Sequence, residues 1–131
     1  MFFRVFLFTS IMLLLTDAQK ITTLGPAPGA PGNMDTKSLK VQELANKIMT
    51  KYNTVSNDPY YYTYVEVISA TEQVVAGLLY RIKLSIGKTD CLKNQVSAAA
   101  NLCNVDKNSI KEINARIVDQ PWLNIFEITF E

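Results

Sequence analysis

Two runs of alternating apolar and polar residues flank a short uncharged segment in the middle of the chain, and they constrain the fold more than any other feature. Before the segment, residues 60–69 are rich in aromatic and β-branched side chains. After it, apolar residues recur at every second position from Leu78 to Ile86. Period 2 is typical of strands with one buried face. The two runs therefore predict an antiparallel hairpin.

The segment between the runs is Gln73-Val74-Val75-Ala76-Gly77. A hairpin tip that faces water is normally polar and rich in turn residues. Two adjacent valines at a tip leave apolar surface without a partner inside the chain, as if it were to be buried against another molecule. The alternative is that the five residues continue a buried strand, and the local pattern taken by itself favours that alternative.

The N-terminus, from Met1 to Ala18, has the organisation of a secretory signal peptide. Arg4 supplies the positive charge, residues 5–15 form an apolar stretch, and small residues precede a cleavage point at Gln19. This stretch is too short for a transmembrane helix. Cleavage would leave one domain's length of chain. The sequence thus predicts a secreted, extracellular protein with no membrane partner.

The composition argues against several functional classes. There is no histidine, which excludes serine or cysteine nucleophiles that need a histidine base and also histidine-based zinc sites. No pair of carboxylates stands out for acid–base chemistry. The thirteen basic residues are scattered among twelve acidic ones without a basic stripe, so we expect no nucleic-acid partner. These features favour a binding protein without a cofactor or metal over an enzyme.

The chain after the predicted signal peptide consists of an N-terminal arm followed by a domain. Residues 19–33 are rich in Gly, Pro, Ala and Thr and cannot bury enough apolar surface to become ordered by themselves. We therefore expect residues 19–33 to form a flexible N-terminal arm and residues 34–131 to form the folded domain.

One amphipathic helix follows the arm, because apolar residues fall at i, i+3, i+4, i+7, i+8 and i+11. This stripe consists of Val41, Leu44, Ala45, Ile48, Met49 and Tyr52. Asp35 or Ser38 can cap the start of the helix, and Asn53 suits a left-handed residue at its end. We expect the stripe to form the core with the concave face of a sheet.

The period-2 pattern breaks between Ile86 and Asn108, where an alanine-rich stretch at 96–102 predicts a short helix. Alternation returns at 113–117 and resumes at 126–130. These later runs predict a second hairpin with Trp122 near its tip.

Both cysteines, Cys91 and Cys103, lie in the interrupted region. The oxidising secretory route favours a disulfide between them. A disulfide that closes a loop of this length would stabilise the folded protein by about 3 kcal/mol. The alternative, two free buried thiols, suits a secreted chain less well.

Several motifs, taken in order, resemble those of the cystatins, which are protein inhibitors of papain-like cysteine proteases. The matching residues are Gly29, Ser56-Asn57-Asp58, Gln73 to Gly77, Gly87, Cys91 with Cys103, and Pro121-Trp122-Leu123-Asn124. The resemblance extends from about Gly29 to Glu131. Ile113 stands where the second disulfide of secreted type 2 cystatins would begin. The chain thus resembles a secreted, type 2-like cystatin with a single disulfide.

The resemblance implies an α+β fold in which an antiparallel sheet of four to five strands wraps around one α-helix. It also implies a reversible, tight-binding inhibitor that blocks the active-site cleft of papain-like proteases such as cathepsins. The inhibitory wedge would combine an arm hinged at Gly29, or alternatively at Gly25, with a first tip at Gln73 to Gly77 and a second at Pro121 and Trp122. The alternative function is a non-inhibitory secreted binding module, antimicrobial or receptor-binding.

Two further expectations rest on the resemblance. Ser56-Asn57-Asp58 resembles the loop with which some type 2 cystatins inhibit legumain, an asparagine-specific protease, so Asn57 is a candidate for a second site. The alternative is a simple turn. Relatives also form domain-swapped dimers by exchanging the helix and its adjoining strand, so we expect a monomer when active and a swapped dimer that no longer inhibits papain.

Overall fold

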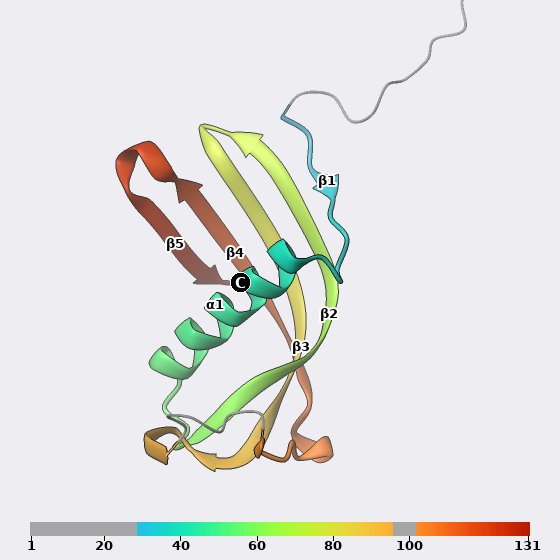
Figure 1. Ribbon diagram of the computed structural model, residues 1–131, viewed down its shortest axis with the longest axis vertical. Helices are drawn as coiled ribbons and strands as arrows, with labels where there is room; N and C mark the ends of the chain where they lie inside the picture. Colours follow the sequence, from blue (N-terminus) through green and yellow to red (C-terminus); the bar gives the residue numbers. More distant parts are fainter. Residues whose placement is uncertain (1–28, 96–101) are drawn as a thin grey trace, which may run out of the picture.

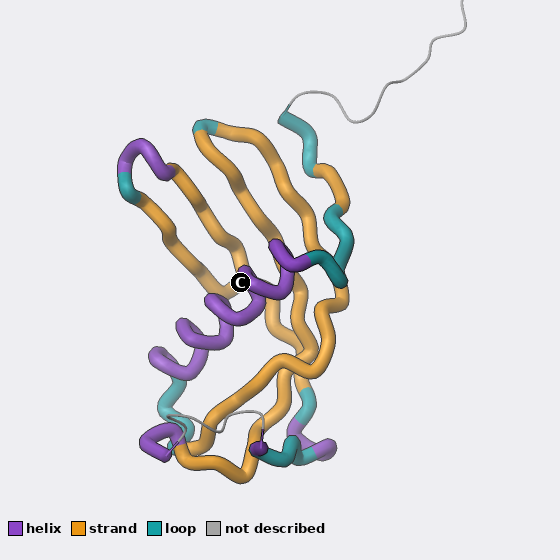
Figure 2. The backbone as a smooth tube through the Cα atoms, viewed as in Figure 1, coloured by secondary structure: helices purple, strands orange, loops and turns teal. Residues whose placement is uncertain are grey.

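The computed structural model describes residues 29–95 and 102–131. Five antiparallel strands form one sheet in the order β1-β2-β3-β4-β5, and one helix lies across a face of it (Figures 1 and 2). The elements are β1 (Gly32–Asn33), α1 (Leu39–Val55), β2 (Tyr60–Val75), β3 (Gly77–Leu92), β4 (Lys111–Gln120) and β5 (Ile125–Phe130), with short 3-10 helices at Lys93–Gln95, Lys107–Ser109 and Pro121–Leu123. The predicted α+β fold is confirmed.

Three sequence-based expectations fall wholly or mostly outside the described residues. These are the signal peptide, the arm before Gly29, and the short helix in the alanine-rich stretch. Within the described part of the chain, none of the helices combines the length and hydropathy needed to span a bilayer.

Helix α1 packs its apolar stripe against the sheet, as predicted. The buried members of the stripe are Val41, Leu44, Ala45, Ile48 and Met49. Each large aliphatic side chain buried in this way contributes about 1.5–3 kcal/mol. Ser38 caps the helix, since its Oγ accepts a hydrogen bond of 3.3 Å from the Val41 N–H. Asp35 instead accepts a bond from the Lys37 N–H in the preceding turn.

The prediction that Asn53 ends the helix is wrong, because α1 continues to Val55. The Asn53 side chain ties the helix to β2. Its Oδ1 accepts a hydrogen bond from the N–H of Tyr62, and its Nδ2 donates one to the carbonyl of the same residue, both at 2.8 Å. These two bonds give hydrogen-bond partners to the backbone N–H and carbonyl of Tyr62 in β2. Asn53 therefore forms a tertiary contact and is not a turn residue.

Strand β3 is also longer than predicted, since it runs past Ile86 to Leu92. The polar residues after Ile86 look like a loop in the sequence, but they remain paired with β2. Thr89 is only 2 % exposed, and its Oγ1 donates a hydrogen bond of 2.6 Å to the Tyr61 carbonyl. A buried hydroxyl satisfied in this way is compatible with a strand interior.

The expected disulfide between Cys91 and Cys103 is present, with the two Cα atoms 5.7 Å apart. The chain that returns from the excursion is also held by hydrogen bonds, because the Asp90 N–H donates to the Asn104 carbonyl at 3.1 Å. The excursion is therefore closed onto β3 both covalently and by pairing.

The sheet separates the segments of interest into two groups at opposite ends of the molecule (Figure 1). The β2–β3 tip, the β4–β5 tip and the chain leading into β1 lie at one end. The connection between α1 and β2 lies at the other end, together with the short helices at Lys93–Gln95 and Lys107–Ser109 that follow β3. The second predicted hairpin, formed by β4 and β5, is confirmed.

Candidate functional site

The first tip is a hairpin that turns at Ala76, with Val75 and Gly77 as its last paired residues. The preceding residues of the segment belong to β2, and Gly77 opens β3. The side chains of Val74 and Val75 are nevertheless 63 % and 43 % exposed. The segment thus continues the strands, as one alternative predicted, but it is not buried. It presents an apolar tip to solvent.

Gly77 has the backbone conformation and the surroundings that require glycine. Its φ is +105°, in the region that glycine adopts most readily. A Cβ at this position would lie 2.5 Å from the Asp119 carbonyl oxygen and 3.3 Å from Cη2 of Trp122. The missing side chain therefore lets the second hairpin approach the first.

The second tip is a 3-10 turn at Pro121–Leu123. It is closed by Asn124, whose φ is +55° and whose N–H donates a hydrogen bond of 3.0 Å to the Pro121 carbonyl. Asparagine tolerates this left-handed conformation better than most residues. The turn leaves Trp122 64 % exposed and Leu123 similarly open. Two large apolar side chains are therefore exposed at the second tip, and the edge of the Trp122 ring lies beside Gly77.

Gln120 joins the two tips, although sequence reasoning did not select it. Its Nε2 donates a hydrogen bond to the carbonyl oxygen of Ala76. A glutamine at the end of a strand carries no distinctive local signal, so only the pairing of β3 with β4 could have pointed to this contact.

The N-terminal segment enters beside the first tip. Gly29 has a φ of +87°, and its carbonyl oxygen accepts a hydrogen bond of 2.7 Å from Nε2 of Gln73. Strand β1 then pairs Gly32 with Glu72 and Asn33 with Thr71. The structure therefore brings Gly29, the first tip and the second tip together at one end of the sheet, while Gly25 lies outside the described residues.

Asn57 lies elsewhere, in the exposed connection between α1 and β2. Both neighbours of Asn57 are held in place. Ser56 Oγ accepts a hydrogen bond from the Asp58 N–H at 3.2 Å, and Asp58 accepts one from the Tyr60 N–H at 2.9 Å and pairs with Lys88 at 3.1 Å. The Tyr60 N–H and the Lys88 ammonium favour the charged carboxylate and lower the pKa of Asp58.

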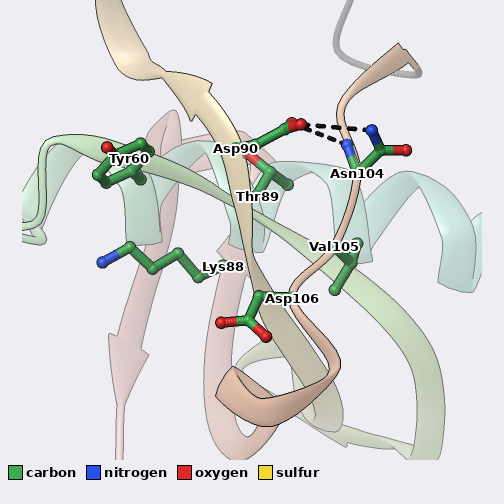
Figure 3. A pocket seen from close by; sticks show the side chains of 7 residues that line it. All are labelled: Tyr60, Lys88, Thr89, Asp90, Asn104, Val105 and Asp106. Atoms are coloured by element: carbon green, nitrogen blue, oxygen red, sulfur yellow. Dashed lines mark hydrogen bonds between the residues drawn. The ribbon is translucent and has the colours of Figure 1, made fainter.

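An open hollow of about 480 Å³ lies next to this connection and includes Tyr60 and Lys88 in its lining (Figure 3). Its lining comprises Tyr60, Lys88, Thr89, Asp90, Asn104, Val105 and Asp106. The charged groups in it already have partners within the chain. Asp90 accepts two hydrogen bonds from Asn104, at 2.9 and 3.3 Å, and Asp106 accepts one from the Asn108 N–H. Among the described residues that line it, the hollow therefore lacks the convergent, unpaired polar groups of a ligand site.

Asp90 also lies close to both cysteine sulfurs. These sulfurs are joined in the disulfide and are not available as thiolates. The three residues cannot hold a metal ion in this state.

Comparison with known proteins decides the family. Residues 29–122 match the family model described as the cystatin domain. The chain belongs to the cystatin family. Cystatin cpi-1 of Brugia malayi is 33 % identical over 91 residues, which cover 69 % of this chain and 72 % of the relative. Cystatin-D of Mus musculus is 30 % identical over 115 residues, covering 86 % and 74 %.

Solved structures are similar in fold. The crystal structure of Al-CPI has a TM-score of 0.72 and 38 % identity, and the match covers 79 % of this chain and 95 % of that one. The salivary cystatin of the soft tick Ornithodoros moubata has a TM-score of 0.66 and 25 % identity, covering 80 % and 97 %. Because cystatins are a family of cysteine protease inhibitors, the expectation that the chain is not an enzyme is confirmed.

Proposed function

We propose that this cystatin inhibits papain-like cysteine endopeptidases, including cathepsins, by inserting its two tips and the arm at Gly29 into the active-site cleft. The observation that supports this proposal most is the convergence of the three segments. They come from distant parts of the sequence, yet they lie at one end of the sheet and expose the apolar side chains of Val74, Val75 and Trp122.

The chemistry of these side chains suits a reversible wedge. Valine is stiff at χ1 and loses at most about 1 kcal/mol of side-chain entropy on burial. Trp122 can bury on the order of 200 Å² against a partner at low entropic cost. Ala76 and Gly77 have little or no side chain, so the backbone of the first tip can approach a protease closely.

The geometry of the first tip also disfavours cleavage. Val75 and Gly77 are paired with each other across the turn. The backbone at Ala76 is therefore folded back between two residues that pair with each other, rather than presented as an extended substrate. We infer noncovalent inhibition by occupation of the cleft.

Titration of active papain with the refolded chain 19–131 tests the proposal. We expect a monomeric inhibitor to abolish activity in proportion to its concentration, with recovery of activity on dilution. The alternative function, a non-inhibitory antimicrobial or receptor-binding module, requires papain to stay fully active at every molar ratio of the chain to papain.

We also propose that the protein is secreted after cleavage before Gln19. The signal-like N-terminus supports this, as does a disulfide of the kind that persists in oxidising compartments. N-terminal sequencing of the protein recovered from the medium of expressing cells would identify the cleavage point. Retention of the intact chain inside the cells would contradict secretion.

We propose a second inhibitory site, for legumain, at Asn57. Its support is an exposed asparagine between two neighbours that are fixed by hydrogen bonds, at the end opposite the wedge. A primary amide offers two donors and one acceptor, and a pocket built for this set rejects other side chains. The two sites are far enough apart to act independently.

The substitution Asn57→Lys distinguishes this site from the first. We expect legumain inhibition to disappear and papain inhibition to stay unchanged. Asn46→Lys, at an exposed position on α1, is the matched control and should affect neither. A wild-type chain that never inhibits legumain would remove the second site and leave the first intact.

A further inference from the structure

The two hairpin tips extend beyond the part of the sheet that joins them. The pairing of β3 with β4 ends at Leu78 and Asp119. The first tip continues past this pair through Gly77 to Ala76, and the second continues through Gln120 to Trp122. Backbone pairing between these strands therefore stops before the two turns, and the relative position of the turns also depends on side-chain contacts.

Gln120 bridges this gap. It is the last residue of β4, and its Nε2 donates to the carbonyl of Ala76, the turn residue of the first tip. Its Cγ lies 2.8 Å from the point where a Cβ on Gly77 would be, and Cη2 of Trp122 lies 3.3 Å from that point. The space left by the glycine is thus occupied by the stem of Gln120 and the edge of the indole ring.

We propose that Gln120 is a positioning residue for protease inhibition, which fixes the first tip relative to Trp122 before the protease is met. This inference rests on the proposed function, because it assigns a role in forming the same wedge. A surface that is ordered in advance loses less conformational entropy on binding. The acceptor is a backbone carbonyl, so the bond depends on this side chain and not on the identity of residue 76.

Three substitutions separate the hydrogen bond from the volume of the side chain. Gln120→Leu keeps a similar size and removes the donor. Gln120→Glu keeps the shape but places a carboxylate against a carbonyl oxygen. Gln120→Asn keeps the amide on a stem that is one methylene shorter. Gln95→Leu is the matched control, because Gln95 is exposed and lies in the 3-10 helix that follows β3.

For Gln120→Leu we expect the inhibition constant for papain to rise about 3- to 10-fold, as for the loss of one neutral hydrogen bond. Gln120→Glu should show a rise at least as large. Gln120→Asn should resemble Gln120→Leu, because the shorter stem does not bring the amide to the Ala76 carbonyl, and Gln95→Leu should show no rise. The increase should appear mainly in the dissociation rate. Unchanged inhibition by Gln120→Leu, with wild-type inhibition present, would overturn the inference and leave the proposed function standing.

A double-mutant cycle distinguishes positioning from a general loss of stability. If Gln120 acts by placing the first tip relative to Trp122, then Gln120→Leu should have little further effect in a Trp122→Ala background. Full additivity of the two substitutions would contradict the proposal. A wild-type chain that fails to inhibit papain would instead remove the proposed function, and this inference with it.

Discussion

Nε2 of Gln73 donates a hydrogen bond of 2.7 Å to the carbonyl oxygen of Gly29, and this bond fixes the point at which the N-terminal arm meets the first tip. The contact lies outside the short pairing of β1 with β2, which starts at Gly32. It therefore extends the attachment of the arm toward the wedge.

Deletion of the arm through Pro28 should weaken papain inhibition only a few-fold. The deletion keeps Gly29 and its bond to Gln73. It removes residues 19–28, in which Ala27 and Pro28 next to the hinge offer little apolar surface, and the removed segment would have to be ordered on binding. Inhibition constants of the truncated and full-length chains test this. A loss as large as that caused by Trp122→Ala would mean that the arm provides a main anchor.

Substitutions at the two tips should weaken papain inhibition far more than deletion of the arm. Trp122→Ala removes the largest exposed apolar side chain of the wedge, and Val75→Asp places a charge on the first tip. We expect each to raise the inhibition constant for papain by about 30-fold or more, the range of interface hot spots. Val65→Asp is the matched control, because Val65 is an exposed valine of β2 remote from the tip. Equal effects of Val65→Asp and Val75→Asp would show that the change acts on folding instead of on the wedge.

The first tip should also control assembly. Straightening the turn at Ala76 would merge β2 and β3 into one long strand and allow two chains to exchange α1 and β2. Such a dimer has no first tip, so we expect it to lose papain inhibition, whereas the connection that carries Asn57 would be retained. Size-exclusion chromatography after mild heating, followed by assays of each peak, tests this. Either a chain that stays monomeric throughout or a dimer that still inhibits papain would contradict it.

Apart from the disulfide, the elements predicted correctly from the residues are those with a local period. The apolar stripe of α1 repeats every three to four residues, and the hairpin strands alternate, so each pattern reports the face that is buried. The exposed tip at Val74 and Val75 was harder to assign, because strand pairing and solvent exposure occur there together. The local pattern indicates strand pairing but does not indicate solvent exposure.

The features that the sequence did not predict are side-chain hydrogen bonds across the fold. Asn53 bonds to Tyr62, and Gln120 bonds to Ala76. In each case the amide has a partner that depends on the packing of one element against another. Asparagine is also frequent in turns, and both amide side chains are mostly found on exposed surfaces, so the residue type alone does not reveal the contact.

Asp58 should make the stability of the fold depend on acid pH. Its carboxylate accepts hydrogen bonds from the Tyr60 N–H at 2.9 Å and the Tyr62 hydroxyl at 3.0 Å, and it pairs with Lys88 at 3.1 Å. The pKa of Asp58 is lowered from its ordinary value of 3.8, chiefly by the Tyr60 N–H. The stabilisation is therefore present above pH 3.8 and is lost as the pH falls through the lowered pKa of the folded state.

Asp58→Asn isolates this contribution. We expect the free energy of unfolding of the wild type to fall on acidification below about pH 4, and that of the variant to fall less over the same interval, because its amide does not titrate. Urea unfolding from pH 7 to pH 2 measures both slopes. Asn57→Gln, which changes the exposed side chain next to Asp58 without adding or removing a titratable group, is the control and should keep the slope of the wild type. Equal slopes for wild type and Asp58→Asn would show that the contacts of Asp58 do not stabilise the native state, and the loop that carries Asn57 would then depend on Ser56 and the adjoining backbone for its conformation.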